Sequence, residues 1–295
     1  MIDISPTALV AQVFTGLVLG GLFVLLATGL SLIFGLMTVV NFSHGALYML
    51  GAYFGYTCIK YLGVSFWVAL ILAPIAVGVV GLLIARFLIR PLHGRSPDDP
   101  LLLTFGLSLV LIETVRLIWG RIGLTFDPPR ALAGAVDLGF GFFPVYRVFV
   151  IAVTVVVLVA LWLFLEKTNM GLIIRAGSRD ALMVRALGFD LSRVWLFVFG
   201  LGVGLAGLAG VLAAPMRGVY AEMGVNMVIE SFVVVVVGGM GSLVGAIVSG
   251  LLIGQVVGIT TFFAPSLAEI MVFIFMAVVL LVRPSGLFGE AGLFE

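Results

Sequence analysis

Charged side chains are scarce in this sequence. Only 10% of the 295 residues are Asp, Glu, Lys or Arg, 63% are hydrophobic, and the mean hydropathy is +1.33. Soluble domains carry about 25% charged residues, and a chain of 31.3 kDa has too much surface to hide this much apolar material from water. The sequence therefore indicates an integral membrane protein in a lipid bilayer. Its net charge of +1 gives no reason to expect a nucleic-acid partner.

Cysteine and histidine are almost absent. The single cysteine, Cys58, excludes an internal disulfide and a thiolate metal cage. The two histidines, His44 and His93, are too few for a histidine-based metal site without acidic help. We therefore expect no metal and no other cofactor. The N-terminus lacks the positive start of a secretory signal, so we expect its first apolar stretch to be kept as a span.

Catalytic motifs are also missing. The sequence has no G-x-x-x-x-G-K-[ST] loop to hold ATP phosphates, no H-E-x-x-H and no G-x-S-x-G. The stretch Gly202–Gly207 matches G-x-G-x-x-G, but it lies inside an apolar run where glycines serve helix packing. Ser43 and His44 are adjacent, and neighbours on a helix point about 100° apart, which does not suit a nucleophile–base pair. We expect no enzyme activity in this chain.

Long apolar stretches predict about eight transmembrane helices. No charged residue occurs between Asp3 and Lys60, which is long enough for two crossings at about 20 residues each. We expect 29–43 to be a short apolar or re-entrant connection, and Met227–Val237, which is short, to raise the count to nine or ten. The fold class is then an all-α integral membrane protein with short re-entrant elements, in one transmembrane domain over 1–295. The predicted spans are 8–28, 44–62, 65–86, 101–119, 148–165, 194–214, 243–263 and 267–282.

The polar stretches between spans set the orientation. None of 86–100, 120–147 and 166–193 is large enough for a soluble catalytic domain. The first and third lie on one side and, with Arg283, hold nine of the fifteen Lys and Arg residues. Because basic residues favour the cytoplasmic side, we expect these stretches inside and the N-terminus outside.

Glycine is abundant and regularly spaced. The 38 glycines include pairs four residues apart, which present a bare stripe where helices approach closely. Such stripes suit movable interfaces in a transporter and static packing equally well, and the pattern does not choose between them. The pairs are Gly16/Gly20, Gly51/Gly55, Gly200/Gly204, Gly241/Gly245 and Gly250/Gly254/Gly258.

Several polar groups fall in or beside apolar runs. They are Glu113, Glu230, Gln255 and Glu269. A charge at mid-membrane costs about 2.5–3.5 kcal/mol, so it is usually paired or faces water. These groups either line a pore, tether helices or reach the membrane surface. The segment Asn41–Gly45 gives a more specific indication of function, because polar non-helical backbone at membrane depth needs surrounding protein or a water-filled cavity. It suits a translocation path or gate, with a tight turn as the alternative.

The stretch 168–193 predicts a short helix on the cytoplasmic side. Ser178 can cap its start, Asp180 falls in its first turn, and Gly188 can close it, giving about nine residues over 179–187. Met183, Val184 and Leu187 share one face, with Arg185 roughly opposite. Such a helix either docks in a groove on another protein or lies on lipid head groups.

Three segments resemble the branched-chain amino acid ABC-transporter permease family. They are GLSLIFGLMTVVNFSHGALYMLGAY at 29–53, the loop AGSRDALMVRALGFD at 176–190 with the following LGVGLAGLAGVL, and the tail VVVVVGGMGSLVG at 233–245 with RPSGLFG at 283–289. As a set they span nearly the whole chain in the family's order. The resemblance implies the importer-type ABC permease fold and the permease subunit of an importer in the bacterial cytoplasmic (inner) membrane.

The resemblance also implies partners and site residues. The partners are two cytoplasmic ABC ATPases, a second related permease, a periplasmic solute-binding protein and a small-molecule substrate, most simply a branched-chain or related amino acid. The loop at about 167–193 would couple to the ATPases. The coupling residues would be Ala176, Arg179, Asp180, Arg185, Ala186 and Gly188. The translocation-path candidates are Asn41, Ser43, His44, Gly45 and Glu230.

Two other functions stay open from the residues alone. An ion-coupled secondary transporter or channel would use buried carboxylates such as Glu113 or Glu230. An intramembrane enzyme would depend on Ser43 or His44.

Overall fold

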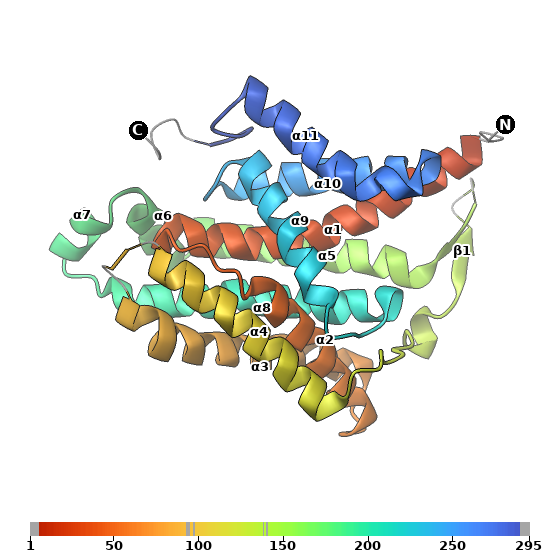
Figure 1. Cartoon of the computed structure of the whole chain (residues 1–295), viewed down its shortest axis with the longest axis horizontal. Helices are drawn as coiled ribbons and strands as arrows, with labels where there is room; N and C mark the ends of the chain where they lie inside the picture. Colours follow the sequence, from red (N-terminus) through yellow and green to blue (C-terminus); the bar gives the residue numbers. More distant parts are fainter. Residues whose placement is uncertain (1–5, 93–94, 97, 138, 140, 290–295) are drawn as a thin grey trace.

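The computed structural model describes residues 6–92, 95–96, 98–137, 139 and 141–289. These residues form eleven α-helices and one short hairpin (Figure 1). The helices that are long and apolar enough to cross a bilayer, α11 only together with the turn before it, are α1 (Pro6–Met37), α3 (Phe66–Ile84), α4 (Asp98–Trp119), α5 (Val145–Lys167), α8 (Leu191–Arg217), α10 (Leu243–Phe263) and α11 (Ala268–Val282). The other helices are α2 (His44–Lys60), α6 (Asn169–Arg179), α7 (Ala181–Ala186) and α9 (Met223–Gly238).

Small elements complete the chain. A π turn, η1 (Ala85–Ile89), and a 3-10 turn, η2 (Arg90–Leu92), extend α3, and 3-10 turns η3 (Arg130–Leu132) and η4 (Pro265–Leu267) lie in connections. Strands β1 (Ala135–Asp137) and β2 (Phe142–Pro144) pair antiparallel. This hairpin is the described exception to the predicted all-α fold.

The membrane-spanning character agrees with the prediction. Seven described helices are long and apolar enough to cross a bilayer, and α2 and α9, with 17 and 16 residues, are shorter. The total is consistent with the predicted eight to ten. One boundary was wrong, because α1 continues to Met37 and only 38–43 leave the helix. Nothing in 29–37 breaks a helix, since its glycines, Gly29 and Gly35, pack against other glycines.

Two helices form the centre of the protein. In the most apolar window of α1, 83% of the residues are buried, and the value for α8 is 72%. Helices α2 and α3 pack on α8, and α10 packs along α1. In contrast, only 17% and 11% are buried in α4 and α11, whose outer faces carry large apolar side chains such as Leu117 and Leu281. These two faces are open to lipid or to another membrane chain.

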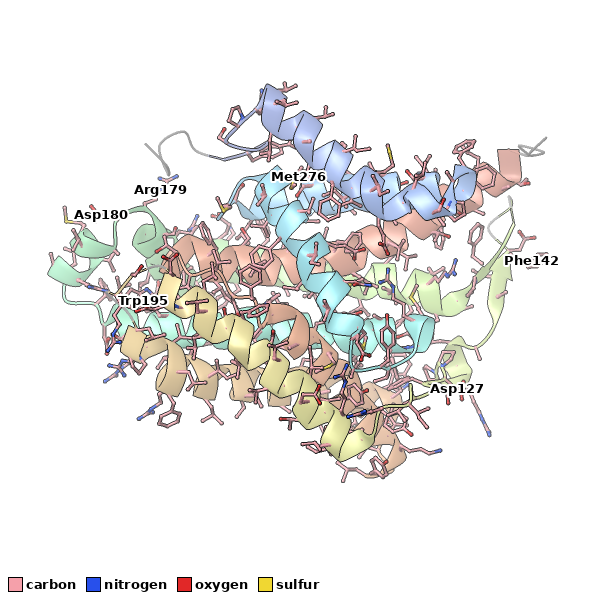
Figure 2. The ribbon with its side chains drawn as sticks, in the orientation of Figure 1. Asp127, Phe142, Arg179, Asp180, Trp195 and Met276 are labelled. Carbon is pink, nitrogen blue, oxygen red and sulfur yellow. The ribbon has the colours of Figure 1, made fainter. Side chains whose placement is uncertain are left out.

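The predicted basic stretches lie at the same end of the molecule. Arg90 and Arg185 line one hollow, and Arg179 lines another with Phe288, which follows Arg283. Figure 2 places Arg179 and Asp180 at this end and Asp127 and Phe142 at the other. The first turn of α1 also lies at that other end (Figure 1). The two basic stretches therefore lie together at one end and the start of α1 lies at the other, as the predicted orientation requires.

Close glycine contacts hold the central helices together. A Cβ on Gly29 would overlap the carbonyl oxygen of Gly202, and one on Gly51 would overlap that of Gly207. The stripe Gly250/Gly254/Gly258 lies along α1, where Gly16 and Gly20 face it. The run Gly202–Gly207 is helical within α8, as predicted.

The predicted Gly241/Gly245 stripe was wrong. Gly241 lies before α10 in a turn with φ of 82°, a conformation that glycine adopts without strain. Only Gly245 is helical, and it packs against Gly238 at the end of α9. A four-residue spacing cannot distinguish a helical stripe from a turn followed by a helix.

Candidate functional site

Helix α2 begins inside the protein at membrane depth. After Met37 the chain turns at Thr38, whose φ of 51° is unusual for a residue with a side chain, and returns along α1. The His44 ring nitrogen Nε2 then lies 3.1 Å from the carbonyl oxygen of Leu26. Leu26 precedes the end of α1 by eleven residues, about 16 Å at ~1.5 Å per residue. The start of α2 therefore lies about a third of the way along α1 from its Met37 end, inside the protein as a re-entrant element requires.

Polar side chains satisfy the non-helical backbone before α2. Asn41 Oδ1 accepts hydrogen bonds from the Ser43 backbone nitrogen at 3.1 Å and from Ser43 Oγ at 2.6 Å. Thr104 Oγ1 of α4 accepts from the Phe42 nitrogen at 3.1 Å. Asn41, Ser43 and His44 are fully buried, with 0% exposure. They build the fold at membrane depth, and their role in translocation stays a prediction.

Helices α2 and α9 meet at this depth. A Cβ on Gly45 would overlap the Gly224 carbonyl oxygen, and one on Gly224 would overlap that of Gly45. The rings of Phe42 and Phe232 also lie 4.9 Å apart. Helices α2 and α9 therefore form one unit in the membrane interior, and Asn41, Ser43, His44 and Gly45 all lie in it.

Glu230 lies on the far side of the same unit. It lines a hollow of about 80 Å³ between α9 and α11. The other lining residues are Asn226, Ile229, Glu269, Val272 and Phe273. Among the described residues, Glu230 Oε2 is buried and accepts no hydrogen bond. Glu230 and Glu269 are thus brought together, although 39 positions separate them in the sequence.

The other polar candidates have structural partners. Gln255 Nε2 donates to the Val13 carbonyl oxygen at 3.0 Å and ties α10 to α1. Glu113 pairs with Arg116, which also pairs with Glu222. Gln255 is therefore a helix tether, and Glu113 belongs to an exposed ion-pair network.

Sequence reasoning missed three residues around this unit. Thr104 lies in an apolar span, Tyr48 is one aromatic residue among many, and Arg217 is one of the six basic residues outside the two basic stretches and Arg283. Tyr48 is fully buried, and the Arg217 guanidinium lies beside Met227, with Nη1 3.9 Å from Sδ. Of these three residues, only Arg217 could have been noticed in the sequence. It is a positive charge three residues after the 21-residue apolar run 194–214.

The short helix at the basic end differs from the prediction. Helix α7 has six residues, Ala181–Ala186, and Asp180 Oδ1 caps it by accepting from the Met183 nitrogen at 2.8 Å. The predicted cap, Ser178, lies inside α6, where its Oγ donates to the Arg175 carbonyl oxygen. Asp180 caps α7 in place of Ser178 because its backbone is extended, so that α6 ends and α7 begins at this one residue. The predicted stop at Gly188 is confirmed by its φ of 87°.

The exposed face of α7 also differs from the prediction. Val184 is 5% exposed and faces the protein, whereas Leu182, Met183 and Leu187 are 78%, 58% and 68% exposed. Arg185 extends over the Trp195 ring, 4.9 Å from its centroid. We call Leu182, Met183 and Leu187 the α7 patch. A helix of six residues is too short for its wheel alone to decide which face turns inward.

All predicted coupling residues are exposed at this one end. Figure 2 shows Arg179 and Asp180 at the outer edge of the molecule, near α7. Beneath them, a Cβ on Gly177 would press on Leu36 of α1 and Leu191 of α8. The exposed residues are Ala176, Arg179, Asp180, Arg185, Ala186 and Gly188. The segment α6–α7 is therefore an outward-facing element seated directly on the two central helices.

A second connection runs from this end to α9. The Leu287 and Phe288 nitrogens donate to the Val237 and Gly238 carbonyl oxygens at 2.8 and 3.0 Å. Phe288 and Arg179 line the same hollow of about 220 Å³. The chain after α11 thus holds the end of α9 next to α6.

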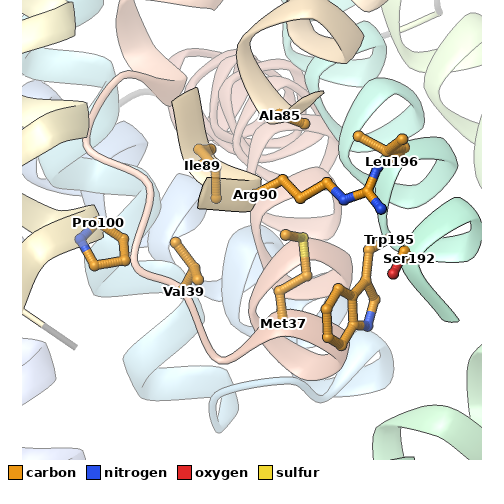
Figure 3. Close-up of a pocket in the computed structure, with 9 residues that line it drawn as sticks. All are labelled: Met37, Val39, Ala85, Ile89, Arg90, Pro100, Ser192, Trp195 and Leu196. Atoms are coloured by element: carbon orange, nitrogen blue, oxygen red, sulfur yellow. The ribbon is translucent and has the colours of Figure 1, made fainter. Parts of the chain in front are cut away.

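The central helices are closely packed at the basic end. Figure 3 shows a pocket between the ends of α1 and α3 and the start of α8, with Arg90 reaching toward Ser192 and Trp195. Its volume is about 20 Å³. That space suits about one water molecule and not an amino acid. Among the described residues, no group of three or more His, Cys, Asp or Glu side chains could hold a metal ion.

Comparisons with known proteins agree with this architecture. Residues 12–282 match the family model described as the permease component of the branched-chain amino acid transport system. The chain is 28% identical to the high-affinity branched-chain amino acid transport permease BraD of Pseudomonas aeruginosa, with 95% of each chain covered. It is also 28% identical to LivH of Escherichia coli over 95% of each chain. The permease LivM of Escherichia coli is 27% identical over 79% of this chain and 60% of its own length.

Proposed function

Because this chain belongs to the family of branched-chain amino acid transport permeases, we propose that it is the membrane-spanning subunit of an ABC importer for leucine, isoleucine, valine or related amino acids. The family match supports this, since it covers nearly the whole chain. The structural observation that carries it is α6–α7, an exposed element seated on α1 and α8. The chain would reside in a bacterial cytoplasmic membrane as one permease domain over residues 1–295.

The chain obtains its energy from partner subunits in this proposal. Two cytoplasmic ATPases bind at the basic end, where the α7 patch and Arg179 offer apolar contact and positive charge. An amphipathic helix that lays its apolar face in a partner groove is a common docking mode. A second permease related to this chain completes the transmembrane unit, as the similarity to LivM suggests. A solute-binding protein delivers the amino acid at the opposite end.

Alternating access follows from these contacts. When the ATPases close, they move α6–α7, and the motion passes through Gly177 to α1 and α8. The glycine contacts let these helices slide without removing side chains from a packed interface. The chain that links Phe288 to Gly238 carries the same motion to α9, whose Glu230 lies at membrane depth. ATP hydrolysis itself takes place in the partners, and this chain performs no catalysis.

Uptake by the complete assembly tests the substrate. The chain should be reconstituted with a second permease, the two ATPases and the binding protein, and radiolabelled leucine uptake measured. We expect vanadate to block uptake, isoleucine and valine to compete, and lysine and glutamate not to compete. Leucine uptake that lysine or glutamate suppresses equally, or no leucine uptake at all, would refute the proposed substrate class.

A further inference from the structure

Glu230 has no partner for its charge. Among the described residues, it forms no ion pair, and its buried Oε2 accepts no hydrogen bond. Its electrostatic neighbours are Arg217 and Glu269, and neither lies within ion-pair contact of it. Membrane proteins rarely keep an unpaired carboxylate in an apolar helix unless it serves a ligand, an ion or a water-filled path.

Arg217 is a second unpaired charge close to Glu230. Within the described ranges, its guanidinium donates only to Met227 Sδ, one helical turn from Glu230 on α9. Arg217 is exposed, and no ion pair with it occurs among the described residues. Five donor groups on a planar guanidinium suit a carboxylate, and no carboxylate in the described part of the chain takes that place.

Tyr48 adds a buried polar group near these charges. Its side chain is 0% exposed, and its hydroxyl has no hydrogen-bond partner among the described residues. Arg217, Glu230 and Tyr220 are its electrostatic neighbours. A buried hydroxyl without a partner is costly, which favours a ligand that completes its hydrogen bonding.

We propose that Arg217, Glu230 and Tyr48 form a binding site for the charged head group of a free amino acid. Arg217 binds the α-carboxylate, Glu230 binds the α-ammonium, and the Tyr48 hydroxyl donates to the carboxylate. This inference rests on the proposed function and assigns its substrate site. A zwitterion offers one charge of each sign a few bonds apart, which matches two opposite charges that lie near each other without pairing.

The walls of the hollow suit an aliphatic side chain. Ile229, Val272 and Phe273 line it beside Glu230, and Glu269 adds negative potential that favours an ammonium group. Arg217 and Tyr48 lie near Glu230 but are not among the residues that line the hollow. Its volume of about 80 Å³ is smaller than a complete ligand pocket of about 300 Å³ or more. This chain therefore supplies one wall of the site, and the second permease supplies the other.

Binding to the permease assembly without the binding protein tests the site. The complete permease–ATPase assembly is placed in lipid nanodiscs, and binding of radiolabelled leucine is measured. The competitors are 4-methylpentanoate, which keeps only the carboxylate, and 3-methylbutylamine, which keeps only the ammonium. The variants are Glu230→Gln, Arg217→Gln and Tyr48→Phe, with Glu113→Gln as the matched control because Glu113 lies in the exposed network with Arg116.

The expected pattern depends on the ligand. Glu230→Gln weakens the binding of leucine and of the amine about tenfold or more and leaves the binding of the carboxylate analogue unchanged. Arg217→Gln weakens the binding of the carboxylate analogue and leaves the binding of the amine unchanged. Tyr48→Phe weakens leucine and the carboxylate analogue, and Glu113→Gln changes nothing. Equal weakening of all three ligands, or no change in any, overturns the site. The proposed function fails separately, if the assembly with its binding protein takes up no leucine.

Discussion

Replacing Arg179 with glutamate is expected to abolish ATP-driven uptake and leave the protein in the membrane. Arg179 is exposed at the end of α6, directly before the α7 cap Asp180. The change removes the positive charge beside the α7 patch and places two carboxylates next to each other at the proposed docking surface for the ATPases. We expect less than about a tenth of normal uptake, because like charges at a docking surface oppose association. Uptake and co-purification of the ATPases measure the effect.

Arg193→Glu is the matched control for this variant. Arg193 carries the same charge, and its side chain is 87% exposed, but it pairs with Asp190 outside α7. Exposed ion pairs contribute at most about 1 kcal/mol, so this variant should keep most of its uptake. Normal uptake by Arg179→Glu would remove Arg179 from the coupling surface, and equal loss in both variants would indicate a general charge effect.

Replacing Gly45 with valine is expected to prevent stable folding. A side chain at Gly45 meets the backbone of Gly224, which cannot move aside as a flexible side chain can. Overpacking against side chains costs about 1–3 kcal/mol, and contact with backbone should exceed that. We expect the membrane abundance of the variant to fall several-fold and its thermal midpoint in detergent to drop.

Gly106→Val separates this effect from the substitution itself. Gly106 lies in α4, and a Cβ there meets nothing within 4 Å. The control should keep normal abundance and thermal stability. If Gly45→Val is as abundant and as stable as Gly106→Val, then α2 and α9 do not meet as the structure has them.

The sequence predicted the features that depend on local composition. Apolar runs gave the spans because a bilayer crossing needs about 20 apolar residues, and Gly188 marked the end of α7 because it permits positive φ. Glycine spacing indicated close helix contacts, and Gly16 and Gly20 do face the glycine stripe of α10. The segment Asn41–Gly45 was recognised as a special feature because polar residues in an apolar region need surrounding protein or water to satisfy their hydrogen bonds.

Features that depend on tertiary packing were beyond the sequence. The length of α1 was underestimated because a crossing was taken as about 20 residues, whereas α1 has 32 and continues to Met37. Val184 was assigned to the docking face because a helix wheel does not say which side meets the protein. Tyr48 and Arg217 lie in different helices, and only the fold brings them near Glu230.

Uptake measured in proteoliposomes shows whether transport by this chain depends on partner ATPases. One set of vesicles contains the isolated chain, and a second set contains the full assembly with ATP inside. Each set receives radiolabelled leucine and the binding protein on the outside, with and without a sodium or proton gradient. We expect accumulation by the full assembly with ATP alone and none by the isolated chain under either gradient. Accumulation by the isolated chain, driven by an ion gradient without nucleotide, would contradict this dependence.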